Sequence, residues 1–274
     1  MLGKTIRMKR LIQQDTGSCI IFAIDHGMTS PTLLRGLMDT RTRVKQAISG
    51  GANVLMLGRG FAYKTVEEFK PDTSLALMMT ACAAGRPAGP KITPISSVEE
   101  ALRLGADAVT VYVALAQDYE PEMIRYLSDV GEKCDFWGMP LIAEAEYPTA
   151  YQSLDTLETE YGADYLKRNA RLCAEMGADI IKVNWPGSIK DMAEIIEATQ
   201  VPVVLAGGPR ISDEELLDRM AQAREAGAIG CSVGRNIFEH ENPEAITRAI
   251  SMIFKDKVSG KVAYEYLQEQ LNRR

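Results

Sequence analysis

A regular alternation of short apolar runs with amphipathic stretches is the feature that most constrains the fold of this chain. Eight short apolar runs are candidates for buried strands, at residues 19–24, 53–57, 75–79, 107–113, 141–145, 179–184, 201–205 and 229–233. Stretches with helical spacing lie between them, such as residues 99–104, 165–176 and 214–226. This alternation predicts a parallel sheet whose strands are connected by helices.

The starts of these runs follow two alternating patterns. A Gly-Ala pair precedes the second, fourth, sixth and eighth runs, at Gly51, Gly105, Gly177 and Gly227. Glycine supplies the left-handed conformation that often ends a helix. The third, fifth and seventh runs instead start at a proline, namely Pro71, Pro140 and Pro202. A two-unit repeat over eight strands predicts a single closed (β/α)8 TIM barrel rather than an open sheet.

The length and charge of the chain fit one globular domain. Its 274 residues match the usual size of such a barrel, about 250 residues. We find no linker, so residues 1–274 are expected to form one domain with a helical tail from residue 256. The net charge of −6 argues against nucleic-acid binding, and no apolar run approaches the ~20 residues of a membrane span. The amino terminus lacks the apolar stretch of a signal peptide, so we expect a cytoplasmic protein.

The cysteines and histidines argue against a disulfide scaffold or a zinc site. The five cysteines form no Cys-x-x-Cys pair, and the chain has only two histidines. We therefore expect reduced thiols in the core and no metal.

Lys182 is the most unusual charged residue of the chain. It interrupts the β-branched run 180–183, which ends in Trp185-Pro186-Gly187, whereas the other twelve lysines lie in polar, turn or helical surroundings. Burial disfavours the ammonium form, so we expect a lowered pKa and an amine able to form a Schiff base with a carbonyl. The alternative is a lysine that reaches from the end of the strand to solvent.

Other polar residues gather where the predicted strands end, which is where barrel enzymes carry their catalytic groups. Asp25 follows the first strand, so its carboxylate should lie in the barrel mouth, where it could pair with Lys182 or accept a proton from a substrate hydroxyl. The adjacent His26 is a candidate second acid or base, or a histidine that is merely hydrogen-bonded in a turn.

Three further candidates follow the fifth strand. Tyr147 could act as an acid or base near an imine, or could be a core aromatic residue that closes the barrel. Glu144 and Glu146 lie on the opposite strand face from Tyr147, and the sequence does not decide which face points inward.

The last two strand ends carry the clearest signal for an anion. Gly207-Gly208 and Gly234-Arg235, the second pair followed by the start of a helix, suit a phosphate. Glycines let backbone N–H groups approach, the helix start adds positive potential, and an arginine binds two oxygens at once. The alternative is that these glycines simply allow tight turns.

Together these motifs make the chain resemble the archaeal-type class I fructose-bisphosphate aldolase family. These Schiff-base (β/α)8 barrels include the aminodideoxyheptulosonate synthases and the autoinducer phosphate thiolases. The resemblance covers nearly the whole chain and is carried by Gly3-Lys4-Thr5-Ile6-Arg7, Asp25-His26-Gly27, Trp137-Gly138-Met139-Pro140-Leu141, Tyr147-Pro148, Ala178-Asp179-Ile180-Ile181-Lys182, Ala206-Gly207-Gly208 and Gly234-Arg235-Asn236-Ile237-Phe238.

The resemblance implies an imine-forming Lys182, a tyrosine acid/base at Tyr147 and a functional aspartate at Asp25. It implies a phosphate site at Gly207, Gly208, Gly234 and Arg235. Members need no metal or other cofactor and are commonly ring-shaped homo-oligomers, and the thiolase branch uses a histidine in its chemistry, which His26 could supply.

Two departures from the family pattern concern the barrel mouth. Where aldolases and synthases typically show Lys-x-Asn-Tyr-Thr-Gly-Asp, this chain has Trp185-Pro186-Gly187-Ser188 after Asn184. Many members place Arg-Gly where Thr149-Ala150 stands here. Both departures bear on the substrate more than on the imine.

Our leading hypothesis is a class I aldolase that cleaves or forms a carbon–carbon bond in a phosphorylated ketose such as fructose 1,6-bisphosphate. The enzymatic alternatives are a transaldolase-type synthase or a thiolase acting on a related phosphorylated keto compound, or an isomerase in which Lys182 acts only through its charge. A further alternative is a sugar-phosphate binding protein without catalytic activity.

Overall fold

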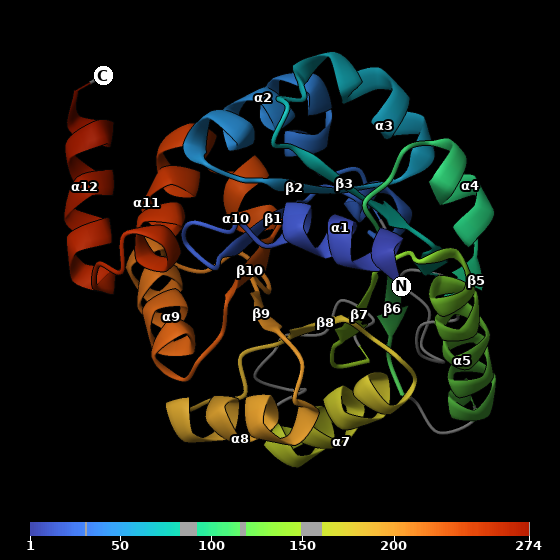
Figure 1. Cartoon of the computed structure of the whole chain (residues 1–274). Helices are drawn as coiled ribbons and strands as arrows, with labels where there is room; N and C mark the ends of the chain where they lie inside the picture. The colour runs from blue at the N-terminus through green and yellow to red at the C-terminus, as the bar shows by residue number, and fades with distance from the viewer. Residues whose placement is uncertain (31, 83–91, 116–118, 149–160, 274) are drawn as a thin grey trace.

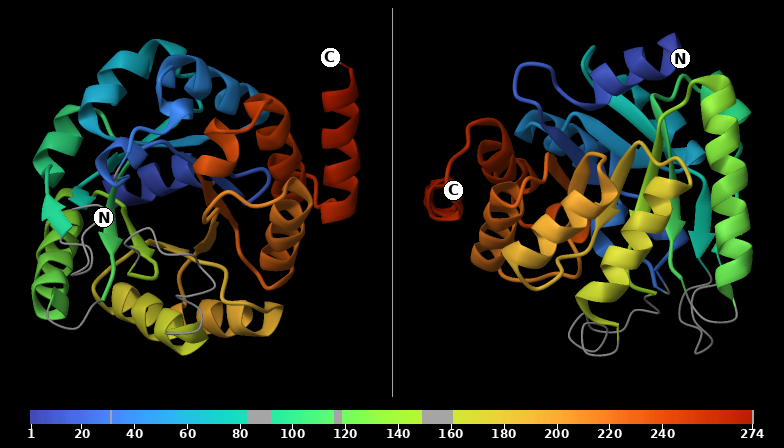
Figure 2. Two further views of the ribbon diagram at one scale, coloured as in Figure 1. Left: turned by 180° about the vertical axis from the view of Figure 1, so that it is seen from behind. Right: turned by 60° about the horizontal axis from the view of Figure 1, so that its bottom comes forward.

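The computed structural model describes residues 1–30, 32–82, 92–115, 119–148 and 161–273. In this part of the chain, eight parallel strands close into a barrel in the order β1-β10-β9-β8-β7-β6-β3-β2 (Figures 1 and 2). The strands are β1 (Cys19–Ala23), β2 (Val54–Leu57), β3 (Ser74–Met78), β6 (Ala108–Val113), β7 (Leu141–Ala145), β8 (Ile180–Val183), β9 (Val203–Ala206) and β10 (Gly230–Val233). Each matches a predicted run to within two residues at its ends. The predicted TIM barrel is therefore confirmed.

Helices surround the barrel on its outside (Figure 1). They are α1 (Leu2–Leu11), α2 (Thr40–Gly50), α3 (Arg59–Thr65), α4 (Val98–Arg103), α5 (Glu120–Trp137), α7 (Gly162–Glu175), α8 (Ile189–Thr199), α9 (Asp213–Glu225), α10 (Arg235–Phe238), α11 (Pro243–Lys255) and α12 (Gly260–Asn272), with the 3-10 turns η1 (His26–Met28), η2 (Arg35–Leu37) and η3 (Val66–Glu68). The predicted helical tail is α12, which packs against α9 and α11. None of the helices described is both long and apolar enough to cross a membrane.

A small second sheet was not predicted from the sequence. It consists of β4 (Thr80–Cys82) and β5 (Ile92–Pro94), which pair in antiparallel orientation. Strands of three residues are too short to show an alternating pattern, so nothing in the sequence distinguished them from a loop.

The glycines of the Gly-Ala repeat have the expected left-handed backbone. Their φ angles are 110° at Gly51, 75° at Gly105, 90° at Gly177 and 109° at Gly227. The repeat therefore marks where four helices turn back into the barrel.

The residues that follow three of these pairs hold α1 across the amino-terminal end of the barrel, where Figure 1 shows it. Asn53 accepts a hydrogen bond from Ile20 N at 2.8 Å, and its amide donates to Leu11 O at 2.9 Å. The side chain thus connects the end of α1 to β1. A buried amide that makes both bonds stabilises the closed end of the barrel.

Three ion pairs complete this closure. Arg10 Nη1 lies 3.0 Å from Asp107 Oδ1, and Lys4 Nζ lies 3.0 Å from Asp179 Oδ2 and 2.6 Å from Asp135 Oδ1. Each cation comes from α1, and two of the carboxylates follow a Gly-Ala pair. The amino-terminal end of the barrel is therefore closed by paired charges.

Candidate active site

The side chains of Lys182 and Glu144 meet inside the barrel. Lys182 lies on β8 and Glu144 on the neighbouring β7, and the two residues are paired in register, so their side chains point to the same face. Both are buried, with 8% and 3% of their surface exposed, and Lys182 Nζ contacts Glu144 Oε1. The buried position of Lys182 is confirmed, and the alternative of a lysine that reaches solvent is wrong.

Two more carboxylates interact with the Lys182 ammonium group. Glu146 Oε1 lies 2.9 Å from Lys182 Nζ, and the buried Asp25 interacts electrostatically with the same ammonium group. Asp25 follows β1, which is separated from β8 by β9 and β10, so the two groups approach each other across the barrel interior. Three carboxylates therefore surround one lysine in the barrel mouth.

The end of β7 determines which of its side chains point inward. Glu146 N donates to Glu144 O at 2.9 Å, a tight turn that directs both glutamates toward Lys182. Tyr147 is fully buried, and its ring stacks on Tyr165 of α7 with 5.9 Å between ring centroids. The orientation that the sequence left undecided is thus settled for the two glutamates.

The protonation state of Lys182 differs from the prediction. Burial lowers its pKa, but Glu144, Glu146 and Asp25 together outweigh burial and raise the pKa above the ordinary lysine value. The resting side chain is an ammonium ion, so the expectation of a lowered pKa is wrong. The sequence reasoning left out the two glutamates, because it could not place them on the inner face.

Glu144 is the group in this cluster that titrates near neutrality. Burial raises its pKa; Lys182 opposes this effect, while Glu146 and Asp25 add to it, and the result is a pKa of about 7. A carboxyl group with such a pKa exchanges its proton readily at neutral pH. Because it touches Lys182 Nζ, it can accept the proton that the ammonium must lose before the amine attacks a carbonyl.

His26 lies between the lysine cluster and the loop after β10. Its Nδ1 is 3.6 Å from Asp25 Oδ1, and its ring meets Phe238 edge-on at 5.1 Å. Burial, together with the nearby Arg235 and Lys182, lowers the pKa of His26 to about 3, although Glu146 acts in the opposite direction. His26 is therefore neutral, and it offers the site a hydrogen-bonding group rather than an imidazolium acid.

Tyr147 is fixed through its main chain. Its N–H donates to Asn184 Oδ1 at 2.8 Å, and its carbonyl accepts a bond from Tyr112 Oη at 2.9 Å. Asn184 and Tyr112 belong to the neighbouring strand ends, so three consecutive strands hold the Tyr147 backbone in place. The acid/base role of Tyr147 stays a prediction.

The four residues predicted to bind phosphate come together at the ends of β9 and β10. Gly207 N donates to Ser232 O at 3.0 Å, which joins the two strand ends. A Cβ on Gly234 would lie 2.4 Å from His26 Cε1, so only glycine allows the histidine ring this close. Gly208 is left-handed with φ 65°, and Arg235 Nε is buried without a hydrogen-bond partner among the described residues. A buried donor of this kind is available to an anion.

Of the two departures from the family pattern, only the one at residues 185–188 lies in the described part of the chain. Trp185 is buried, and Ser188 accepts a hydrogen bond from Asp191 N at 3.0 Å, which caps α8. Thr149-Ala150 lies outside the described residues.

In the described ranges, no three histidine, cysteine, aspartate or glutamate side chains are arranged to hold a metal ion. Cys19, Cys134, Cys173 and Cys231 are buried free thiols, as predicted, and burial raises the pKa of Cys19 to about 12.

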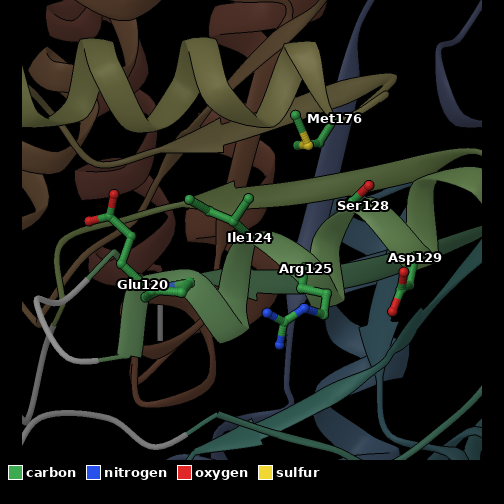
Figure 3. Close-up of a pocket in the computed structure, with 7 residues that line it drawn as sticks. Glu120, Ile124, Arg125, Ser128, Asp129 and Met176 are labelled. Carbon is green, nitrogen blue, oxygen red and sulfur yellow. The ribbon is translucent and has the colours of Figure 1, made fainter.

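A groove on the outer surface is separate from this site. Figure 3 shows it along α5, beside the end of α7, lined by Glu120, Pro121, Ile124, Arg125, Ser128, Asp129 and Met176. None of the residues around Lys182 lines it, so it carries no part of the chemistry discussed here.

Sequence reasoning missed two kinds of site residue. It singled out Glu144 and Glu146 without a role, because their orientation depends on a single turn at the end of β7. It did not identify Asn236, whose side chain joins the loops after β9 and β10. The only signal for Asn236 was its position directly after the Gly234-Arg235 pair.

Comparison with known proteins gives concordant results. The model of the DeoC/LacD family of aldolases matches residues 19–240. The 2-amino-3,7-dideoxy-D-threo-hept-6-ulosonate synthase of Halobacterium salinarum is 33% identical over 261 residues, which cover 95% of each chain. The 2-amino-4,5-dihydroxy-6-oxo-7-(phosphonooxy)heptanoate synthase of Streptomyces griseus is 34% identical over 251 residues, 91% of this chain and 89% of the relative. The crystal structure of an archaeal fructose 1,6-bisphosphate aldolase superposes with a TM-score of 0.80 at 24% identity, covering 92% of this chain and 99% of that chain.

Proposed function

Because the chain belongs to the DeoC/LacD family of aldolases, enzymes that form or cleave carbon–carbon bonds, we propose that it is a class I aldolase acting through a Schiff base on Lys182. Its substrate would be a phosphorylated ketose. The alternative of a binding protein without catalytic activity is wrong, since the family consists of enzymes. The observation that carries the proposal is a buried lysine in contact with a carboxylate whose pKa is about 7.

The first step would be imine formation. Glu144 takes a proton from the Lys182 ammonium, and the free amine attacks the ketone carbon of the substrate. The oxygen takes up the proton from Glu144 to give a carbinolamine. A proton then moves from the carbinolamine nitrogen to this hydroxyl, which leaves as water, and the protonated imine that remains keeps the positive charge of the original ammonium.

The second step would be cleavage of the carbon–carbon bond. A base removes the proton of the hydroxyl next to the bond, an aldehyde leaves, and the bonding electrons move into the imine to give an enamine. Tyr147 is our candidate for this base, and Asp25 would orient the hydroxyl. Protonation of the enamine and hydrolysis return the ketone and the free lysine, and the reverse sequence forms the bond.

Substrate anchoring would fall to the loops after β9 and β10. The backbone at Gly207, Gly208 and Gly234 would form the cradle, and the Gly208 N–H and Arg235 Nε, which has no hydrogen-bond partner among the described residues, would bind the phosphate group. His26 lies between this cradle and the lysine cluster, since its ring packs against Gly234 and its Nδ1 is 3.6 Å from Asp25 Oδ1. A substrate held by its phosphate would therefore pass the neutral His26 to reach the amine.

A synthase reaction is the second candidate. The two relatives that are 33% and 34% identical are named as synthases, whereas the archaeal fructose 1,6-bisphosphate aldolase is only 24% identical. Both candidates use the same imine, and they differ in the acceptor aldehyde.

Trapping with sodium borohydride tests the proposal. Reduction in the presence of dihydroxyacetone phosphate should add the mass of one reduced ketone to the intact protein. Lys182→Ala should abolish the added mass, and Lys190→Ala, which changes an exposed lysine on α8, should leave it unchanged. Turnover without any adduct would instead favour an isomerase-like role in which Lys182 acts only through its charge.

The assembly of the protein also stays a prediction. We expect a ring-shaped homo-oligomer, and light scattering on the purified protein would give its mass.

A further inference from the structure

A single buried side chain connects the two loops of the proposed phosphate cradle. Asn236, in α10, is fully buried, and its amide nitrogen donates to Gly207 O at 2.9 Å and to Pro209 O at 2.8 Å. Its carbonyl oxygen accepts a bond from Ile211 N at 3.1 Å. Both donors and the acceptor of this amide are therefore used on one loop, residues 207–211.

These bonds determine which way the loop presents its own donors. In a trans peptide the C=O of one residue and the N–H of the next point in opposite directions, and the described backbone has no cis peptide bond. Since the Gly207 carbonyl points to Asn236, the N–H of Gly208 points away from it. The same holds for the Pro209 carbonyl and the N–H of Arg210. Neither N–H has a hydrogen-bond partner within the described ranges.

The other loop is fixed by the same residue, because Asn236 directly follows Arg235. Gly234 O accepts bonds from Ile237 N at 2.8 Å and Phe238 N at 3.0 Å, which close the short turn of α10 around Asn236. Arg235, whose buried Nε has no partner in the described part of the chain, therefore has a fixed spacing to the loop 207–211.

We infer that Asn236 is the positioning residue of the phosphate cradle: it sets the spacing of the two loops and turns the Gly208 N–H toward the phosphate monoester. This inference rests on the proposed function. Asn236 does not touch the reacting atoms, so its effect should appear in the binding of the phosphate group and not in the chemistry of the imine.

A purely structural role would make the same bonds, so the test needs a matched control. Asn53 is also buried, with 2% exposed, and it also bridges two segments, through Leu11 O and Ile20 N. It lies at the opposite end of the barrel. The stability lost by Asn53→Ala should thus resemble that of Asn236→Ala without any effect on the phosphate cradle.

The experiment compares two ketones that differ only in phosphate. For wild type, Asn236→Ala, Asn236→Ser and Asn53→Ala, borohydride-trapped adduct is measured by intact mass against the concentration of dihydroxyacetone phosphate and of dihydroxyacetone. Asn236→Ala should raise the half-saturating concentration of the phosphorylated ketone at least about tenfold, since three backbone groups lose their partner. The value for dihydroxyacetone should stay within about twofold. Asn236→Ser keeps one donor and should give an intermediate shift, and Asn53→Ala should change neither value.

The outcomes separate this inference from the proposed function. A folded Asn236→Ala, or a folded Asn236→Ser if the alanine variant does not fold, that keeps the wild-type preference for the phosphorylated ketone overturns the inference alone. An equal loss in Asn53→Ala overturns it too, since the effect would then come from general destabilisation. If borohydride traps neither ketone on the wild-type protein, no Schiff base forms, and both the proposed function and this inference are wrong.

Discussion

The two ends of this barrel each hold a lysine among carboxylates, and they differ in what surrounds the pair. At the amino-terminal end, Lys4 pairs with Asp135 and Asp179, whose side chains are 70% and 19% exposed. At the carboxyl end, Lys182 lies among carboxylates that are at least 85% buried, and one of them, Glu144, has a pKa of about 7. Both lysines have a raised pKa.

This comparison shows that the lysine's own pKa does not separate a structural from a reactive amine. What distinguishes Lys182 is an adjacent buried carboxyl group that is able to receive its proton at neutral pH. The ion pairs of Lys4 are partly exposed to solvent and hold α1 in place. The following predictions test this distinction, from the largest effect to the smallest.

The strongest contrast is between the two lysine variants. Lys182→Met should lower the rate of carbon–carbon bond cleavage or formation at least about 10⁴-fold, because the nucleophile is lost. Lys4→Met should leave the rate within about threefold. Steady-state kinetics on both variants measure this. A large loss of activity in folded Lys4→Met would contradict the distinction between a structural lysine at the amino-terminal end of the barrel and a reactive lysine at the carboxyl end.

Glu144→Gln removes the proton acceptor but keeps the shape of the side chain. The rate of imine formation at pH 7 should fall by about 10²- to 10⁴-fold, the range of general acid–base catalysis. In wild type the rate should rise as the pH increases through about 7, because the carboxylate form of Glu144 accepts the proton. The variant should lack this rise, and its rate should recover only at high pH, where hydroxide removes the proton. Stopped-flow mixing with the ketone follows the rate, and an unchanged profile in the variant would assign the step to another group.

Lys4→Met should lower the stability of the folded protein, whereas variants of Lys182 should lower the enzymatic activity. The partly exposed ion pairs with Asp135 and Asp179 should contribute about 1 kcal/mol to the free energy of unfolding, since solvent screens them. Chemical denaturation of wild type and variant measures this difference. Asp135→Asn, which removes the more exposed partner, should have a smaller effect than Lys4→Met.

The smallest effect concerns the pH dependence of stability. The pKa of Glu144 rises from the ordinary value of 4.5 to about 7 in the folded protein, so folding binds a proton between these values. Its contribution to stability is full below about pH 4.5 and is lost as the pH rises through about 7. The melting temperature of Glu144→Gln should therefore fall less than that of wild type between pH 5 and pH 8. A steeper fall in the variant would contradict the direction of the shift.

The fold was predictable because its signals are local. Each barrel strand showed a short apolar run, and each Gly-Ala pair indicated a left-handed turn, such as the one at Gly51. The pair of three-residue strands β4 and β5 offered no such pattern.

The site was predictable only in part, because its chemistry depends on contacts between strands. The burial of Lys182 followed from its neighbours in the sequence. Its charge did not, because Glu144 meets it only through the register of β7 and β8. Asn236 was missed for the same reason, since its three bonds reach across to the loop after β9.

Peptide mapping of the borohydride-reduced protein tests the central claim most directly, because it asks which of the 13 lysines carries the ketone. The account predicts a single modified peptide, containing Lys182, whose labelling drops sharply in Glu144→Gln. Modification of Lys4 to the same extent as Lys182, or labelling of Lys182 that is unaffected by Glu144→Gln, would contradict it.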